Sequence, residues 1–280
     1  MATIYVGVDG SDCAALALRW AGEEGRARGL PVVAVMAWGY LDQRHAVSDQ
    51  GFDPAYSEET ARSALAAFVA AADLTGVVEE RVVNDLAPNA LLGLAGPDDL
   101  IVVGARGLGG FKGLLLGSVS QRIVAESPCP VVVVRDGGQP QGPVVVGVDG
   151  SQNARRALEW AVAEARARGV GLLVVHGWTA PFVGGYAFAA VSFDHRLVEE
   201  GARAMVEEVV ADVDTSGVPL EIRVTPGSGA GVVLDHAPEA SLVVVGSRGL
   251  TGFTRWLLGS VSHQVVLHAP GTAVVVPHQD

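Results

Sequence analysis

The chain repeats itself at a domain-sized interval. The segment YVGVDGS at residues 5–11 returns as VVGVDGS at residues 145–151, an offset of 140 residues. The glycine-rich segment GARGLGGFKGLLLGSVS at 104–120 returns as GSRGLTGFTRWLLGSVS at 246–262, an offset of 142. This interval is too long for one unit of a solenoid and suits a whole domain. We therefore predict two copies of one domain, over residues 1–135 and 144–280, joined by a linker rich in glycine and proline at residues 136–143.

Strand and helix signals alternate within each copy. Residues 32–36 and 100–103 are continuous apolar runs of strand length, as expected for strands buried on both faces of a parallel sheet. A helical pattern opens at Ser11 and closes at Gly29. The first copy is expected to have strands at 3–8, 32–36, 77–83, 100–103 and 131–134, a long loop at 38–55, and later helices at 58–74, 87–95 and 118–125. The second copy repeats this order, with its long helix at 199–213. This predicts an α/β protein with two tandem Rossmann-like, doubly wound domains, each a five-stranded parallel sheet with helices on both faces.

The composition narrows the class of ligand. The chain has 49% hydrophobic residues, which is ample for packed cores, and no apolar run long enough for a membrane helix. It shows no leader pattern, and we expect a cytoplasmic protein without a membrane partner. The net charge of −12 argues against nucleic acid, which requires a basic stripe. A small phosphate ligand stays open, because backbone N–H groups can hold it without net positive charge.

The repeated glycine segment has the properties of a phosphate site. In each copy an apolar strand is followed by G-x-x-G, nine residues, and then G-S-V-S at the start of a helix. Glycines after a strand allow positive φ and a close approach of the backbone to a ligand. The first N–H groups of a helix have no helical partner and attract anions. Ser118 and Ser120 would add hydroxyl donors. This pattern predicts a polyphosphate site.

An aspartate follows the first strand of each copy. Asp9 and Asp149 lie in V-G-V-D-G-S, at the strand end that should face the same crevice. A carboxylate there suits ribose hydroxyls better than phosphate, since like charges repel. The alternative is a helix N-cap, a role that Ser11 fills better than Asp9. The chain has no P-loop, no dinucleotide fingerprint and no Cys/His metal spacing.

These residues resemble the universal stress protein family, whose ATP-binding members carry G-2x-G-9x-G-[S/T]. The full motif occurs twice, and the resemblance covers nearly the whole chain. It implies one ATP site per copy, with Mg²⁺ accompanying the nucleotide, with the phosphates on the glycine loop and the adenine near the end of the second strand. The implied nucleotide-binding residues are Gly7, Asp9, Ala37, Gly104, Arg106, Gly107, Gly109, Gly110, Gly117, Ser118, Val119 and Ser120 in the first copy, and Gly147, Asp149, Gly177, Gly246, Arg248, Gly249, Gly252, Gly259, Ser260, Val261 and Ser262 in the second.

The resemblance also bears on assembly and activity. Family members pair through their last strands, so residues 131–134 and 273–276 could pair within this chain as an internal pseudo-dimer, and a homodimer of chains is plausible. Three functions stay open: a nucleotide-dependent regulatory protein of the stress response, a slow ATPase, and a nucleotide-free interaction scaffold. We favour binding, because the sequence repeats no general base and no metal site, and only Arg106 and Arg248 recur as cations beside the loop. The two cysteines, Cys13 and Cys129, are expected to be core residues.

Overall fold

The computed structural model describes residues 2–39, 57–108, 115–179, 195–249 and 258–278. Most of the long loop expected at 38–55, and the three predicted site residues Gly109, Gly110 and Gly252, lie outside these ranges. The described residues include no helix that is long and apolar enough to cross a membrane.

Strands and helices alternate as the sequence predicts. The first half contains β1 (Ile4–Gly7), α1 (Asp12–Arg28), β2 (Val32–Trp38), α3 (Glu58–Ala71), β3 (Glu79–Asn84), α4 (Ala87–Leu94), β4 (Leu100–Gly104), α5 (Ser118–Glu126) and β5 (Val131–Val134). The second half contains β6 (Val144–Gly147), α6 (Gln152–Arg168), β7 (Leu172–Trp178), α7 (His195–Ala211), β8 (Leu220–Pro226), α8 (Gly229–His236), the short 3₁₀ helix η1 (Ala237–Glu239), β9 (Leu242–Gly246), α9 (Ser260–His268) and β10 (Ala273–Val276).

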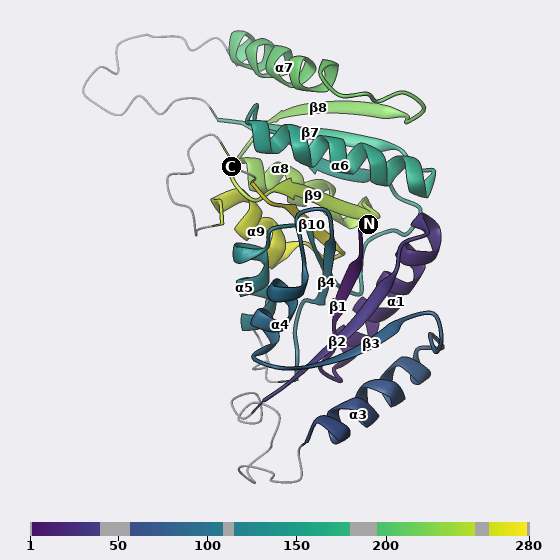
Figure 1. Cartoon of the computed structure of the whole chain (residues 1–280). Coiled ribbons are helices and arrows are strands. Elements are labelled where there is room, and N and C mark those ends of the chain that lie inside the picture. The colour runs from purple at the N-terminus through teal and green to yellow at the C-terminus, as the bar shows by residue number, and fades with distance from the viewer. Residues whose placement is uncertain (1, 40–56, 109–114, 180–194, 250–257, 279–280) are drawn as a thin grey trace, which may run out of the picture.

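The ten described strands form one sheet, in the order β3-β2-β1-β4-β5-β10-β9-β6-β7-β8 (Figure 1). Pairing is parallel within each half, and β5 pairs antiparallel with β10, with Val132 opposite Val274. The predicted pairing of the two last strands within the chain is therefore confirmed. It places the inner edge of each half against the other, so that only β3 and β8 remain as edges of the described sheet.

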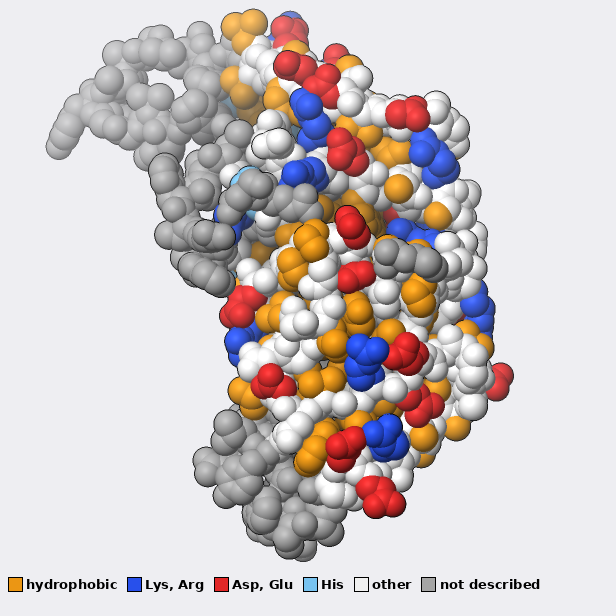
Figure 2. Space-filling view, in the orientation of Figure 1, with side chains coloured by type: hydrophobic (Ala, Val, Ile, Leu, Met, Phe, Trp, Pro, Cys, Tyr) orange, Lys and Arg blue, Asp and Glu red, His pale blue; other side chains and the backbone are white. Residues whose placement is uncertain are grey.

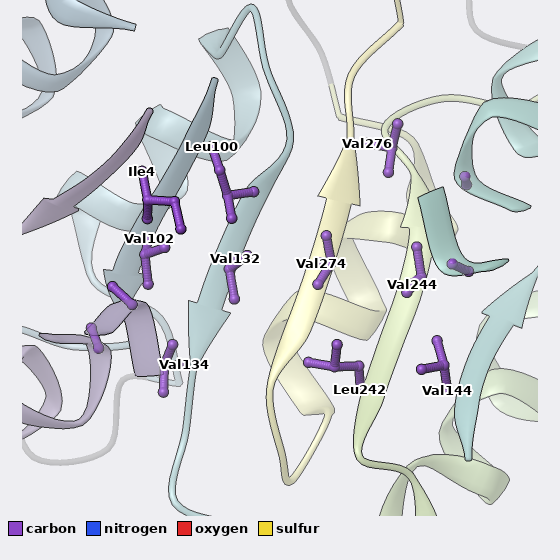
Figure 3. Packing of buried hydrophobic residues seen from close by; sticks show 14 of the residues in the cluster. Ile4, Leu100, Val102, Val132, Val134, Val144, Leu242, Val244, Val274 and Val276 are labelled. Carbon is purple, nitrogen blue, oxygen red and sulfur yellow. The ribbon is translucent and has the colours of Figure 1, made fainter. Parts of the chain in front are cut away.

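Helices cover both faces of the sheet. The buried residues of α1, α3, α6 and α7 pack in one hydrophobic cluster, and those of α4, α5, α8 and α9 pack in the other. Alternate residues of a strand serve the two clusters: Ala34 belongs to the first and Val35 to the second. The first cluster continues across the junction of the halves. Figure 3 shows two of its members there, Val132 on β5 and Val274 on the neighbouring strand β10. Figure 2 shows acidic and basic side chains interspersed over one face of the molecule.

The segment between the halves is docked on the second half. A Cβ on Gly142 would collide with the carbonyl oxygen of Glu239, and one on Gly138 would lie 2.7 Å from the carbonyl oxygen of Ala240. The Gln139 N–H donates to that Ala240 oxygen at 2.9 Å. The glycines of this segment thus permit close backbone contact, a role that composition alone did not reveal.

Four charged side chains join α1 to α6. We call Glu24, Arg28, Glu164 and Arg168 the charge cluster. Each arginine pairs with the glutamate one turn before it on its own helix and with the glutamate of the other helix. Each guanidinium also lies over a tryptophan ring of the other helix, Arg28 at 5.6 Å from Trp160 and Arg168 at 5.4 Å from Trp20. The repeated sequence therefore produces a symmetric contact between the halves.

Candidate functional site

The candidate site lies where the strand order of each half reverses. β1 runs between β2 and β4, and the chain leaves it toward α1 and β2, so the carboxyl ends of β1 and β4 flank the switch point. Backbone pairing continues past β1, because the Val8 N–H donates to the Val35 carbonyl oxygen at 2.9 Å. This pairing brings Asp9, beyond the carboxyl end of β1, beside Ala37 near the carboxyl end of β2. β6, β7 and β9 repeat the arrangement in the second half, with Asp149 and Gly177 at the corresponding positions.

Asp9 connects the end of β1 to the glycine turn. Its Oδ1 accepts the Ser11 N–H at 2.9 Å, and its Oδ2 accepts the Leu108 N–H at 3.0 Å. The helix-capping role belongs to Ser11, whose hydroxyl accepts the Ala14 N–H at 3.2 Å. Asp9 is exposed and a carboxylate offers about four lone-pair directions, so it keeps acceptor capacity for a ligand. In the second half, Asp149 accepts the Ser151 N–H at 3.1 Å.

The second glycine of each G-x-x-G turn is required by this aspartate. A Cβ on Gly107 would collide with Oδ2 of Asp9, and a Cβ on Gly249 would collide with Oδ2 of Asp149. The aspartate and the glycine turn are therefore one unit, and it is built in the same way in both halves.

The first glycine of each turn is required by a helix. A Cβ on Gly104 would lie 2.6 Å from the backbone of Cys13 in α1, and one on Gly246 would lie 2.7 Å from the side chain of Asn153 in α6. The positive φ that glycine allows is not used at Gly104, Gly107, Gly246 or Gly249. Among the described glycines, positive φ near the site occurs at Gly10, with φ of 87°, and at its counterpart Gly150. Close packing, and not an unusual backbone conformation, requires glycine in the G-x-x-G turn.

Two other glycines of the predicted site allow α4 and α8 to pack closely against the sheet. A Cβ on Gly7 would lie 2.9 Å from Cδ1 of Leu91 in α4, and a Cβ on Gly147 would lie 2.8 Å from Cγ2 of Val233 in α8. Both glycines therefore let a helix approach the strand end that carries the aspartate.

α5 and α9 begin beside the glycine turns. The Gly117 N–H donates to the Ala105 carbonyl oxygen at 2.8 Å, which ties the start of α5 to the turn. The first residue of α5, Ser118, is exposed, Val119 is half-buried, and none of the described side chains caps the helix. The N–H groups of the first turn therefore remain available as donors, unlike those of α1, which is capped by Ser11.

α9 repeats this geometry. The Gly259 N–H donates to the Ser247 carbonyl oxygen at 2.8 Å, and Ser260 and Val261 are exposed. No side chain in the described part of the chain caps this helix.

The second serine of each G-S-V-S segment holds the loop together. The Ser120 hydroxyl is buried and donates to the Gly104 carbonyl oxygen at 2.7 Å. The Ser262 hydroxyl is also buried and lies 3.0 Å from the carbonyl oxygens of Ser247 and Gly259. The prediction that Ser120 adds a donor for the ligand differs from this arrangement, because the hydroxyl proton is used within the fold. Periodicity could not show which way the hydroxyl points.

A model of the universal stress protein family matches residues 1–135 and again residues 142–277. The chain belongs to the universal stress protein family. Its tandem organisation is shared by curated relatives of similar length. A universal stress protein of Mycolicibacterium smegmatis is 32% identical over 98% of this chain and 96% of its own. One from Mycobacterium tuberculosis is 31% identical over 97% of this chain and 94% of its own.

Solved structures share the fold. A universal stress protein from Archaeoglobus fulgidus matches 99% of this chain and 97% of its own with a TM-score of 0.66, at 21% identity. A putative universal stress protein from Pseudomonas aeruginosa matches 98% of this chain and 92% of its own with a TM-score of 0.64, at 15% identity.

The two halves of this universal stress protein differ in the residues that pack against the glycine turn. Cys13 stands where the second half has Asn153, whose side-chain nitrogen donates to the Arg248 carbonyl oxygen at 3.1 Å. Ala105 stands where the second half has Ser247, whose hydroxyl accepts the His278 N–H at 2.9 Å. Sequence reasoning did not assign these roles. A comparison of the two copies, position by position, was the signal that could have found them.

The two predicted arginines, and a histidine beside the predicted Gly177, are placed as follows. Arg106 is exposed, and its carbonyl oxygen accepts the Ser11 hydroxyl at 3.4 Å; Arg248 is half-buried. His176, at the carboxyl end of β7, has Nδ1 2.8 Å from the Val148 carbonyl oxygen, which fixes the proton on that nitrogen because a carbonyl only accepts. No group of three or more His, Cys, Asp or Glu side chains in the described part of the chain is arranged to hold a metal ion.

Proposed function

We propose that each half of this universal stress protein binds one adenine nucleotide, ATP together with Mg²⁺, and that the protein acts as a nucleotide-dependent regulator in the stress response. One observation carries the proposal. In both halves a helix without a side-chain cap begins against a G-x-x-G turn, and the carboxylate that follows the first strand packs against that turn.

The phosphates would bind at the starts of α5 and α9. The backbone N–H groups at Ser118 and Val119 are donors without helical partners, and the positive end of the helix dipole favours an anion there. Gly117 leaves this approach open, since even a Cβ would lie 3.6 Å or more from the neighbouring atoms of the turn. Mg²⁺ would be carried by the phosphates, with which it usually binds through few protein ligands.

The nucleoside would lie along the strand ends. Asp9 has acceptor capacity left for ribose hydroxyls after binding the backbone, and Asp149 would take the same role at the corresponding position of the second half. The adenine would lie near Ala37 in the first half and Gly177 in the second. Gly177 leaves little room for a side chain, because a Cβ there would lie 2.9 Å from the carbonyl oxygens of Gly227 and Ser228.

Binding is favoured over efficient hydrolysis by the chemistry that recurs in both halves. Beside the described part of each glycine turn the recurring carboxylates are Asp9 and Asp149, and each already accepts a backbone N–H. Phosphoryl transfer requires a positioned water and cations on the transferred group. A regulatory output fits this set of residues better than turnover at the ~1 to 1,000 per second of dedicated enzymes.

The test is the nucleotide content of the purified chain. Freshly purified protein is denatured, and the released nucleotide is identified by chromatography, followed by re-binding of ATP, AMP or cyclic AMP to stripped protein. We expect one ATP per half. The matched variants Gly117→Asp and Gly259→Asp each place a carboxylate at one phosphate position and should each remove one nucleotide. A wild-type chain that neither retains nor re-binds an adenine nucleotide would contradict the proposal and favour an interaction scaffold. A steady-state assay with Mg²⁺ separates binding from catalysis.

A further inference from the structure

Arg135, the residue after β5, joins the glycine loop of the first half to a helix of the second. Its Nη2 donates to the Leu115 carbonyl oxygen at 3.0 Å, in the segment that leads into α5. The same nitrogen lies 2.6 Å from the Val266 carbonyl oxygen and 3.4 Å from that of Leu267, both in the last turns of α9. One guanidinium therefore bonds both Leu115, just before the proposed phosphate site at the start of α5, and α9 of the second half.

The antiparallel junction makes this bridge possible. β5 and β10 run in opposite directions, so the carboxyl end of β5, beside the first glycine loop, meets the end of α9 that leads into β10. The last carbonyls of a helix lack helical partners and carry the negative end of its dipole, so a cation there is favourable. The opposite end of the same nine-residue helix carries Ser260 and Val261, the proposed phosphate donors of the second site.

The bridge is present on one side of the junction. The position that matches Arg135 in the second copy is Pro277, which has no side-chain donor and cannot reach the end of α5 in this way. Arg135 is also constrained by its surroundings. Its Nη1 is buried without a hydrogen-bond partner among the described residues, and burial, followed by the charge of Arg106, lowers the pKa of the guanidinium. Arginine nevertheless stays protonated, and its bonds to carbonyl oxygens are charge-assisted.

We propose that Arg135 couples the two nucleotide sites, so that occupation of the first phosphate loop raises the affinity of the second site. This inference rests on the proposed function. A phosphate at the start of α5 restrains residues 115–117, including the Leu115 carbonyl oxygen that accepts from Arg135, and thereby fixes Arg135. Arg135 then holds the carboxyl end of α9, whose other end binds the second phosphate. Fixing Arg135 lowers its conformational entropy, and this loss occurs only once, when the first nucleotide binds. The effect is reciprocal, because each ligand must change the affinity of the other by the same factor.

The first experiment measures ATP binding to the nucleotide-stripped full chain. The affinity of the second site is determined in Gly117→Asp, where the first site is blocked, and in the intact chain as the microscopic constant of the second site with the first site occupied, after correction for the statistical factor of two-site binding. We expect the blocked chain to bind ATP at the second site about 5-fold or more weakly, the lower end of typical coupling. With Arg135→Gln added to both chains, the two constants should coincide. Equal constants in the presence of Arg135, or a difference that survives Arg135→Gln, would overturn the inference.

Two further variants separate charge from bridging. Arg135→Lys keeps the positive charge but replaces the planar fork with one ammonium, and coupling should fall as it does in Arg135→Gln. Coupling retained in full by lysine would show that charge alone acts and would overturn the bridge. Arg122→Gln is the matched surface control, because the Arg122 guanidinium pairs with Glu126 of its own helix α5, and it should leave coupling unchanged.

The second experiment needs no nucleotide. Amide hydrogen exchange of the stripped chain compares Ala269, which donates to Val265 at the end of α9, with Ser127, which donates to Ile123 at the matching end of α5. Arg135→Gln should accelerate exchange at Ala269 and at Gly117 and leave Ser127 unchanged. Unchanged exchange at Ala269 would refute the bridge even if ATP binds. If the wild-type chain binds no ATP, the proposed function fails separately, while this exchange result still shows whether the bridge exists.

Discussion

At the scale of single residues, a methyl group at Gly107 should disconnect the strand end from the glycine turn. The added Cβ collides with the Asp9 carboxylate, which must move and release the Leu108 N–H. We expect Gly107→Ala to lower the free energy of unfolding by about 1 to 3 kcal/mol, the cost of breaking such a contact, and to weaken ATP binding at the first site. Chemical denaturation and ATP titration measure the two effects.

The control for Gly107→Ala is a glycine with free space. Gly93→Ala in α4 introduces a Cβ with nothing within 4 Å, and it should stabilise the chain by about 0.5 to 1 kcal/mol because alanine favours a helix. Removing the carboxylate as well, in Asp9→Ala/Gly107→Ala, should eliminate the collision. Additive losses in this double variant would show that the aspartate and the glycine are independent, contrary to the geometry.

Cys129 provides a prediction about alkaline pH. Burial raises the pKa of its thiol from 9.0 to about 11, partly offset by the hydrogen bond with Ser127. Below about pH 9 the thiol is protonated in both the folded and the unfolded chain. Between about pH 9 and pH 11 only the unfolded chain loses the proton. The free energy of unfolding therefore falls by about 2 to 3 kcal/mol over this window.

Urea unfolding at pH 8 and at pH 10.5 measures this loss. Cys129→Ala should show a smaller fall in stability between the two pH values than the wild-type chain, and Cys13→Ala is the matched control that should keep the wild-type fall. An equal fall in Cys129→Ala would show that the buried thiol is not responsible.

At the scale of elements, the starts of α5 and α9 contrast with those of α1 and α6. Ser11 and Ser151 cap α1 and α6, whereas glycine precedes α5 and α9 and no side chain among the described residues satisfies their first N–H groups. Buried serines instead fix the two uncapped helices through backbone carbonyls of the glycine turns. The helices are thus held in position while their donors stay open, which is the arrangement that an anion site requires.

The segment between the halves acts as a docked element. Gly142→Ala places a Cβ against the Glu239 carbonyl oxygen, and we expect it to lower the free energy of unfolding by about 1 to 3 kcal/mol, as for other overpacked contacts. The matched control is Gly201→Ala in α7, where nothing lies within 4 Å. Thermal or urea unfolding compares the two. A Gly142→Ala chain as stable as the wild type would mean that the segment is a loose linker.

At the scale of the whole molecule, the charge cluster ties the halves together away from the sheet. Glu164 is fully buried and pairs with both Arg28 and Arg168, so its removal leaves two guanidinium groups to share Glu24. We expect Glu164→Gln to lower the free energy of unfolding by about 3 to 5 kcal/mol, the typical cost of breaking a buried ion pair from one side. Equilibrium unfolding measures the loss.

The control for Glu164→Gln is Glu58→Gln, which removes the exposed pair with Arg62 and should cost less than about 1 kcal/mol. Equal effects of the two substitutions would show that the charge cluster is worth no more than a surface pair. Breaking the cluster should also loosen the contact of α1 with α6, detectable as faster amide exchange in their last turns.

Sequence periodicity predicted the tandem fold because its signals are local. Apolar runs defined β2 and β4, Ser11 and Gly29 marked the ends of α1, and the glycine motif predicted the start of α5 at Ser118. The predicted ends of β3 and α7 differ from the structure by a few residues, because strand and helix ends depend on tertiary contacts that no local pattern contains.

The repeat by itself determined that there are two equivalent candidate sites. The glycine motif has the same spacing in both copies and follows matching strands, so the two copies fold in the same way. Only the tertiary structure decided why the residues of each site are needed. It assigned Gly104 to the packing of α1 and Gly107 to the Asp9 carboxylate, and it directed the Ser120 hydroxyl inward. It also brought Arg135 to α9 across the antiparallel pairing of β5 with β10. These contacts join residues far apart in the chain, and their geometry is set by how helices and strands pack, which spacing along the sequence does not specify.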